Sequence, residues 1–296
     1  MERTLSVVGA GRAGGALAAA AAARGWRVAA VASRDASHRE QLAAATGASA
    51  VRTAAQAAQA AALTVIAVPE SQVMRVAATI AANGIALRGR VVAHCSASLG
   101  TAPLASLRQN AAAVGVAHPL QALSGAESAE LIAGSYFRIE GDTAALPVLE
   151  SFVADLGGVR LQVAPEQRAL YHAAAVLAGN APLTLLARAT ALLVDAGVDT
   201  DSAHAALAAL LEGSARNARR VGAAAALTGP VARGDAATVQ ANLDALAMHP
   251  DARELYLRLA KEMLALAGTN GRAEVAAVLD AAQQPARPRL ARTRVA

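Results

Sequence analysis

Short apolar runs alternate with longer helical patterns through the first half of the chain. Runs rich in Val, Ile and Ala are typical of buried strands, and helix-length segments separate them. This alternation predicts parallel β-α-β units, whose ligands bind at the carboxyl ends of the strands. After an N-terminal strand, the expected strands are Arg27 to Ala32, Leu63 to Val68, Arg90 to Cys95, Ala113 to Ala117, Tyr136 to Glu140 and Val159 to Val163.

The pattern changes after Pro165, because no convincing strand follows between Glu166 and about Ala282. Apolar-periodic helices are expected there, broken at Gly197, Gly213, Gly229-Pro230, His249-Pro250 and Gly268 to Gly271. The predicted fold is an α/β Rossmann domain with a doubly wound, mostly parallel sheet, followed by an all-α helical domain. The predicted divisions are residues 1–164, residues 165–284 and a disordered basic tail at 285–296.

A glycine-rich pattern stands between the first strand and the helix-forming run Ala16 to Ala23. Gly9 permits a tight turn, Gly11 lets the backbone approach a pyrophosphate, and Gly14 allows close packing of helix on strand. The helix N-terminus offers N–H groups to the phosphates. Dinucleotide binding is therefore predicted for Gly9, Ala10, Gly11, Arg12, Ala13 and Gly14. The alternative is a tight turn that binds no ligand.

The tip of the second strand indicates which dinucleotide is bound. An acid at this position would accept from the ribose hydroxyls of NAD, but Ser33 and Arg34 stand here instead. A hydroxyl and a guanidinium hydrogen-bond and neutralise a 2′-phosphate, so NADP(H) is favoured. Asp35 is the main counter-argument. The cofactor should also contact the ends of the next two strands, at Val68, Pro69, Ser71, Cys95 and Ser96.

Composition excludes several other classes of protein. The single cysteine excludes a disulfide framework and a cysteine-based metal site, which favours a cytoplasmic location without metal. Four of the five net positive charges lie in the tail, at Arg287, Arg289, Arg292 and Arg294. The nearly neutral body predicts no nucleic-acid partner. The alanine-rich run Ala13 to Ala23 is shorter than the roughly 20 residues needed to cross a bilayer, and glycines interrupt any signal-peptide core, so no membrane association is expected.

Several motifs, taken in order, carry a family resemblance. They are GAGRAGGAL, VASR, VIAVPE, HCSAS, HPLQAL, FRIEGD, YHAAAVLAGN and ALTGPVARGD. Nearly the whole chain resembles Rossmann-like oxidoreductases whose second half is a domain of unknown function. More distantly it resembles 6-phosphogluconate and β-hydroxyacid dehydrogenases, pyrroline-5-carboxylate reductase and ketopantoate reductase, which bind substrate between two domains. The resemblance implies NADP-dependent reduction of a small carbonyl or imine, with ketopantoate as the first substrate to try.

The helix beginning near Tyr171 allows a closer comparison. Ketopantoate reductases carry a lysine proton donor here, followed by asparagines four and eight residues later. This chain has His172 at the lysine position, Val176 at the first asparagine and Asn180 at the second, with Thr184 in a following Pro-Leu-Thr step. The only lysine, Lys261, lies far along the chain. We therefore predict His172 as the acid and Tyr171 as the reserve, because an imidazole titrates near neutral pH.

The remaining candidates would contact substrate. His118, at the end of a strand, is expected to bind substrate or serve as a second acid; a related His-Pro element occurs in prephenate dehydrogenases. Thr228 and Arg233 lie in a loop that opens a helix, where the guanidinium would clamp a carboxylate. The alternatives are a strand-capping histidine, a helix start with Asp235 near its N-cap, and a structural role for His172.

The predicted function is hydride transfer between NADPH and a small carbonyl substrate such as a 2-keto acid, bound between the two domains. In this scheme Asn180 supplies electrostatic stabilisation and His172 or His118 the proton. The alternatives are reduction of a cyclic imine and a non-catalytic NADP-binding sensor or scaffold. Alanine-rich helices without a polar covering also predict a homodimer through the helical domain.

Overall fold

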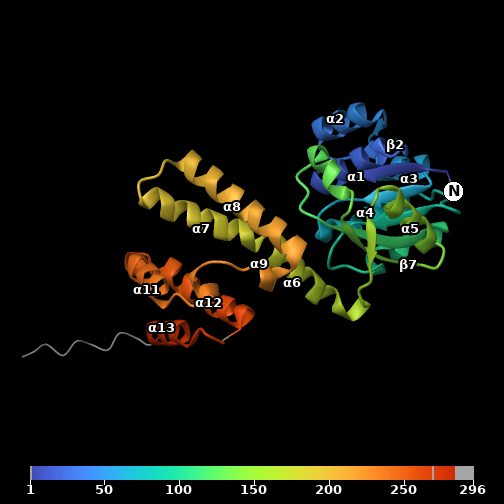
Figure 1. Ribbon diagram of the computed structural model, residues 1–296. Helices are drawn as coiled ribbons and strands as arrows, with labels where there is room; N and C mark the ends of the chain where they lie inside the picture. Colours follow the sequence, from blue (N-terminus) through green and yellow to red (C-terminus); the bar gives the residue numbers. More distant parts are fainter. Residues whose placement is uncertain (1, 269, 284–296) are drawn as a thin grey trace, which may run out of the picture. The chain divides into compact units, whose positions relative to one another are not determined.

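The computed structural model describes residues 2–268 and 270–283. Contacts divide the chain into two units, Met1–Ala181 and Pro182–Ala296. The first unit is built on a sheet and the second contains helices alone among its described residues, which confirms the predicted fold class (Figure 1). The predicted disordered tail, residues 285–296, lies outside the described residues.

A single eight-stranded sheet organises the first unit, in the order β3-β2-β1-β4-β5-β6-β7-β8. Neighbouring strands are parallel except β6 and β7, which pair antiparallel. The strand order reverses between β1 and β4, where open α/β sheets bind their ligands. The bounds are β1 Thr4–Val8, β2 Arg27–Ala32, β3 Ser49–Val51, β4 Leu63–Ile66, β5 Val91–His94, β6 Ala113–Leu120, β7 Tyr136–Gly141 and β8 Val159–Leu161.

Helices cover both faces of this sheet, each over its own hydrophobic core. Successive strand residues alternate between the faces, so Val65 joins the core under α1, α2, η2 and α5, and Ile66 joins the core under α3, α4 and η1. Phe152 and Val73 are among the helical residues that close the two cores. The bounds are α1 Arg12–Ala23, α2 Ala36–Thr46, α3 Ala54–Ala60, α4 Glu70–Ala82, η1 Ala102–Asn110, η2 Ala126–Ile132 and α5 Leu146–Asp155.

The first unit ends with a helix that the sequence assigned to the helical domain. A short turn, η3 (Pro165–Gln167), leads into α6 (Arg168–Gly179). Arg168 forms an ion pair with Glu140 of β7, and this contact ties the start of α6 to the sheet. The change of sequence pattern at Pro165 is real, but the contacts divide the chain after Ala181.

In the second unit, helices α10 to α13 pack around one small core. Val239, Leu243, Leu257 and Val275 are among the buried residues that form it. The predicted break at Gly213 is wrong, since α8 continues through this residue; a helix tolerates an interior glycine at a modest cost in stability. The bounds are α7 Ala181–Asp195, α8 Thr200–Val221, α9 Ala223–Ala226, α10 Pro230–Arg233, α11 Ala236–Ala245, η4 Leu246–Met248, α12 Pro250–Ala267 and α13 Ala273–Gln283.

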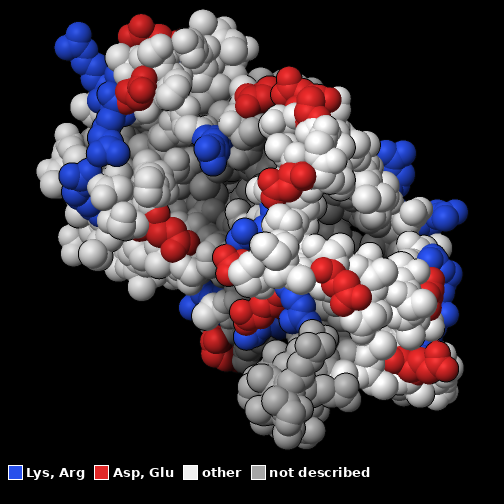
Figure 2. Space-filling view, turned by 90° about the vertical axis from the view of Figure 1, so that its left-hand side faces the viewer, with Lys and Arg blue, Asp and Glu red and all other residues white. Residues whose placement is uncertain are grey.

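The stretch formed by η3, α6 and α7 exposes much apolar surface. Neither α6 nor α7 has a buried residue, and Leu177 is 71% exposed. Among the described residues, Pro165–Asp195 is long and apolar enough to cross a bilayer, with a mean hydropathy of 1.4. On the face drawn in Figure 2, basic and acidic side chains are interspersed over a mainly uncharged surface. The sequence analysis considered only the shorter N-terminal run, Ala13 to Ala23, and did not identify this stretch.

Candidate functional site

The three fingerprint glycines meet different surroundings. Gly9 has a φ of +110°, and a Cβ on it would collide with the carbonyl oxygen of Ala67. A Cβ on Gly14 would collide with the carbonyl oxygen of Gly9 and lie 3.0 Å from the Val7 side chain. Only at Gly11 is there open space, with no atom within 4 Å of an added Cβ. The geometry therefore matches the predicted turn, close packing and free approach to the backbone.

The space beside Gly11 lies at the start of a helix. Gly11 is the N-cap of α1, and no side chain caps this end. The first N–H groups of such a helix attract anions. A hollow of about 480 Å³ borders this loop, lined among others by Gly11, Arg12, His38, Gln41 and Glu127. The open space beside Gly11 and the uncapped helix N-terminus are compatible with a bound pyrophosphate.

Asp35 has a structural role at the tip of β2. It is the N-cap of α2, where its Oδ1 accepts a hydrogen bond from the N–H of His38 at 2.9 Å. That bond holds the pKa of the carboxyl below its ordinary value. Arg34 is exposed, and Ser33 is partly buried with its carbonyl bound by Arg39. The counter-argument from Asp35 is therefore weakened, because its carboxylate is turned to its own helix.

The ends of β4 and β5 are joined by a carboxylate that the sequence analysis missed. Glu70 accepts hydrogen bonds from the N–H and the hydroxyl of Ser98, at 3.1 and 2.6 Å. These bonds, with the nearby His172 and His94, hold its pKa below the ordinary value against the opposing effect of burial. The predicted cofactor residues Pro69 and Ser71 flank Glu70 at the N-terminus of α4. Through these hydrogen bonds, Glu70 joins the loop after β4 to the loop after β5, and both loops are predicted to line the cofactor.

The loop after β5 is held from within by a histidine. His94 is fully buried, its Nδ1 accepts from the N–H of Ser96 at 3.1 Å, and its Nε2 lies 2.9 Å from the carbonyl oxygen of Gly100. This pairing defines a neutral imidazole, and burial lowers its pKa. Burial also raises the pKa of Cys95 to about 12, so its thiol is no nucleophile at neutral pH.

His118 meets Tyr171, the reserve acid. The Nδ1 of His118 on β6 lies 2.7 Å from the hydroxyl of Tyr171 on α6, and the rings are edge to face. Burial, followed by the positive charge of Arg138, lowers the pKa of His118 to about 4. Burial raises the pKa of Tyr171. At neutral pH this is a pair between a neutral imidazole and a protonated phenol.

A partly buried ion triad, formed by Arg138, Glu140 and Arg168, lies next to this pair. Arg138 donates to Glu140 at 3.0 Å, and Arg168 donates to both oxygens of the same carboxylate, at 2.5 and 2.9 Å. The Arg138 guanidinium also lies 6.0 Å from the centre of the Tyr171 ring. The motif FRIEGD contains both strand residues, and two charges at alternate positions of a buried strand could have indicated the triad.

The other predicted residues are placed as follows. His172 is exposed beside Tyr171 and close enough to Glu70 to lower its pKa, and Asn180 is exposed at the end of α6. Thr184, Thr228 and Arg233 are exposed in the second unit, where their contact with substrate stays a prediction. Asp235 is the N-cap of α11, accepting from the N–H of Thr238 at 3.0 Å, which supports the helix-start alternative for this loop.

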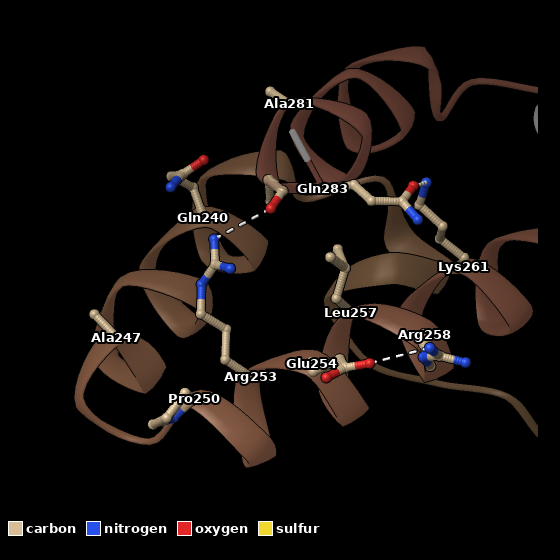
Figure 3. A pocket seen from close by; sticks show the side chains of 11 residues that line it. Gln240, Ala247, Pro250, Arg253, Glu254, Leu257, Arg258, Lys261, Ala281 and Gln283 are labelled. Carbon is tan, nitrogen blue, oxygen red and sulfur yellow. Dashed lines mark hydrogen bonds and ion pairs between the residues drawn. The ribbon is translucent and has the colours of Figure 1, made fainter. Parts of the chain in front are cut away.

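The second unit has a larger hollow of about 1060 Å³ between α11, α12 and α13 (Figure 3). Its cations already have partners: Lys261 donates to Asp280 and Gln283, and Arg258 to Glu254. Arg253 contacts a carbonyl at the end of α13. Lys261 and Arg253 thus join α12 to the last described helix, α13.

Two family models match this arrangement. Residues 2–119 match the Rossmann-like domain, and residues 135–263 match the domain of unknown function DUF2520. The chain joins a Rossmann-like domain to a DUF2520 domain. This confirms the resemblance drawn from the ordered motifs. No curated protein matches the sequence.

Solved structures agree with this assignment over nearly the whole chain. A candidate NADP oxidoreductase from Bacteroides fragilis is 23% identical, with a TM-score of 0.70, covering 88% of this chain and 97% of its own. Protein TM1727 from Thermotoga maritima is 23% identical, with a TM-score of 0.68 and coverage of 90% and 99%. An imine reductase from Pseudomonas sp. is 21% identical, with a TM-score of 0.60 and coverage of 94% and 98%. At these identities the likeness establishes a shared fold.

Proposed function

We propose that this protein is an NADP(H)-dependent oxidoreductase that reduces a small carbonyl compound, with a 2-keto acid such as ketopantoate as the first candidate. The glycine loop carries the proposal, because Gly9 and Gly14 leave no room for a side chain while Gly11 opens onto a helix N-terminus. The name of the Bacteroides fragilis structure, which shares the fold, supports the same cofactor and chemistry. A cytoplasmic location is part of the proposal.

The chain would hold the cofactor along the carboxyl edge of its sheet. The glycine loop would take the pyrophosphate and Arg34 the 2′-phosphate, while the loops joined by Glu70 and Ser98 would line the nicotinamide. When bound, the reduced nicotinamide supplies a hydride to the carbonyl carbon. The residues of this chain must then exclude water, orient the substrate and deliver one proton to the developing alkoxide.

Tyr171 is better placed than His172 to deliver that proton. Tyr171 is partly exposed and its hydroxyl is bonded to His118, so the imidazole N–H can stabilise the phenolate left after proton transfer. His118 itself is uncharged at neutral pH and has no second proton to give, because its pKa lies at about 4. His172, the acid predicted from the sequence, makes no hydrogen bond within the described residues.

A second candidate function, reduction of a cyclic imine, is favoured by the charges at the strand ends. Both guanidiniums of the ion triad are bound to Glu140, so they are not available for a substrate carboxylate. Glu70 adds a carboxylate whose partners are a hydroxyl and an N–H. The negative charge of Glu70 would attract a protonated imine. The imine reductase that shares the fold supports this alternative.

One assay series tests the proposal. The purified chain is titrated with NADPH and NADH, and then supplied with NADPH and small 2-keto acids, 3-keto acids or cyclic imines while cofactor oxidation is followed. Oxidation with a keto acid supports the first candidate, and oxidation with imines alone supports the second. Tight NADPH binding without oxidation of any compound would favour the non-catalytic sensor, and absence of NADPH binding would refute the whole proposal.

Exchange of Arg34 for aspartate should weaken NADPH binding by roughly 10- to 100-fold and leave NADH binding much less affected. A charge-assisted hydrogen bond to the 2′-phosphate is lost and a repelling charge replaces it. Asp35→Asn is the matched control, since asparagine caps a helix as well as aspartate and removes only the charge. Fluorescence titration of both nucleotides measures the ratio. Equal losses in Arg34→Asp would show that Arg34 does not contact the phosphate.

We further propose that a second copy of the chain covers the apolar stretch from η3 to α7. A dimer of twice 29.6 kDa is expected in light scattering after gel filtration. Leu177→Glu should give a monomer, because Leu177 is 71% exposed on this stretch. Met74→Glu is the matched control, at 68% exposure on α4. A monomeric wild type that binds lipid vesicles through this stretch would point to a bilayer instead.

A further inference from the structure

The ion triad leaves an excess of positive charge inside the first unit. Arg138 is 1% exposed, although burying a guanidinium is costly unless its charge and donors are matched. One carboxylate, Glu140, serves two guanidiniums, so the triad carries one net positive charge. The Nε of Arg138 has no partner among the described residues, although it is buried. The fold therefore sustains a buried cation that its own ion pairs do not neutralise.

The guanidinium of Arg138 lies close to both members of the His118–Tyr171 pair. Arg138 is the cross-strand partner of His118 in the antiparallel pairing of β6 and β7. Its guanidinium is also 6.0 Å from the centre of the Tyr171 ring. A cation at this distance attracts the electrons of a phenol ring, and it attracts a full phenolate charge more strongly.

We propose that Arg138 is a positioning residue that keeps His118 uncharged and stabilises the phenolate of Tyr171 as the phenol gives up its proton. The inference rests on the proposed function for the step in which the proton is used. Tyr171 loses one proton to the substrate oxygen and becomes a phenolate. The phenolate accepts a hydrogen bond from the N–H of His118. Arg138 supplies the opposite charge without transferring a proton.

The other charges around the pair do not provide this stabilisation. Glu70 on α4 raises the pKa of His118, opposite to the effect of Arg138, and the negative charge of Glu140 on β7 would oppose a phenolate. His172 on α6 and His94 on β5 also lower the pKa of His118, by less than Arg138 does, and His172 is exposed to solvent, which screens its charge. Arg168 on α6 is bound to both oxygens of Glu140. Arg138 is therefore the buried positive group that faces both members of the pair.

Arg138 also fixes the two elements that must meet during the reaction. Its guanidinium donates to the carbonyl oxygens of Ser96 and Leu99, at 3.0 and 2.7 Å, in the loop predicted to line the cofactor. Through Glu140 it is joined to Arg168, which stands three residues before Tyr171 and so on the same side of α6. One side chain thus connects the cofactor loop with the helix that carries the proton donor.

The test compares variants that change the local charge in opposite directions. Arg138→Met removes the cation, Arg138→Lys keeps it without the fork of donors, and Glu140→Gln removes the anion. The pKa of His118 is followed by NMR of its ring protons, identified with His118→Gln, and that of Tyr171 by ultraviolet titration, identified with Tyr171→Phe. Tyr136 and Tyr256 serve as internal controls, and neither cofactor nor substrate is added.

Arg138→Met is expected to raise the pKa of both groups by about one pH unit or more, the usual effect of a charge at this distance. Arg138→Lys should restore most of the difference, and Glu140→Gln should lower both values. If Arg138→Met does not fold, the lysine and glutamine variants still decide the question. A lowered or unchanged pKa in Arg138→Met, or a raised one in Glu140→Gln, would overturn the inference.

The same variants separate this inference from the proposed function. The titrations depend only on the free chain, so a chain that shows the expected pKa changes and reduces no substrate would sink the proposed function alone. Where a substrate is turned over, Arg138→Met should lower kcat, because a phenol with a higher pKa gives up its proton less readily. The decrease in kcat should be at most roughly tenfold for each unit by which the pKa of Tyr171 rises. If Arg138→Met keeps a normal kcat and unchanged pKa values for His118 and Tyr171, Arg138 has only a structural role.

Discussion

Replacing Gly11 by valine should abolish NADPH binding and leave the chain folded. The backbone there has a φ of −85°, which valine tolerates, and an added Cβ meets no atom within 4 Å. The new side chain would occupy the space in which a phosphate meets the N–H groups of α1. Each charge-assisted hydrogen bond lost costs about 1.5 to 3 kcal/mol, so a loss of at least ~100-fold in affinity is expected.

Two glycine controls make this result specific. Gly213→Val places the same side chain in open space within α8 and should keep normal NADPH affinity. Gly14→Val should instead destabilise the first unit, because the added atoms collide with the Gly9 carbonyl. Circular dichroism checks folding, and fluorescence titration measures binding. Tight NADPH binding by Gly11→Val would refute the dinucleotide interpretation of the loop.

Tyr171→Phe should lower kcat by roughly 100- to 10,000-fold, the usual contribution of general acid catalysis, with NADPH affinity unchanged. The substitution removes one oxygen atom and keeps the ring that packs against His118. Steady-state kinetics on any compound that the wild type reduces, with a nucleotide titration alongside, gives both values.

The pH dependence follows from the same assignment. Tyr171 is active while protonated, so turnover should be full below its pKa and fall as pH rises through it; this alkaline limb should lie above the ordinary range for tyrosine, because burial raises the pKa. On the acid side, His118 should stay neutral down to a pH of about 4. His172→Ala is the parallel control. Loss of turnover in His172→Ala with normal turnover in Tyr171→Phe would return the role of the acid to His172.

The sequence was sufficient to locate most of the sheet, since buried parallel strands are continuous apolar runs. It did not reveal β3, Ser49–Val51, whose three residues are too few and too exposed to form a pattern. It also left open the direction of β7, because pairing direction depends on the path of the intervening chain through η2. Local sequence likewise could not show whether Asp35 faced a ribose or capped its own helix.

The candidate site was harder to predict because its contacts join residues far apart in sequence. His118 and Tyr171 are 53 positions apart, and their contact depends on where α6 crosses the sheet. Each had been singled out separately, as a strand-end histidine and as a reserve acid. The ion triad that holds α6 in place was missed, since Arg168 looks like an ordinary charged residue at a helix start until Glu140 is found opposite it.

The division of the chain after Ala181 has a consequence for how such proteins diversify. The glycine loop, Arg34 and the His118–Tyr171 pair all precede it, whereas Thr184, Thr228 and Arg233 follow it. Under the proposed function, mutations in the later segment can retune which molecule is accepted without disturbing redox chemistry or proton delivery.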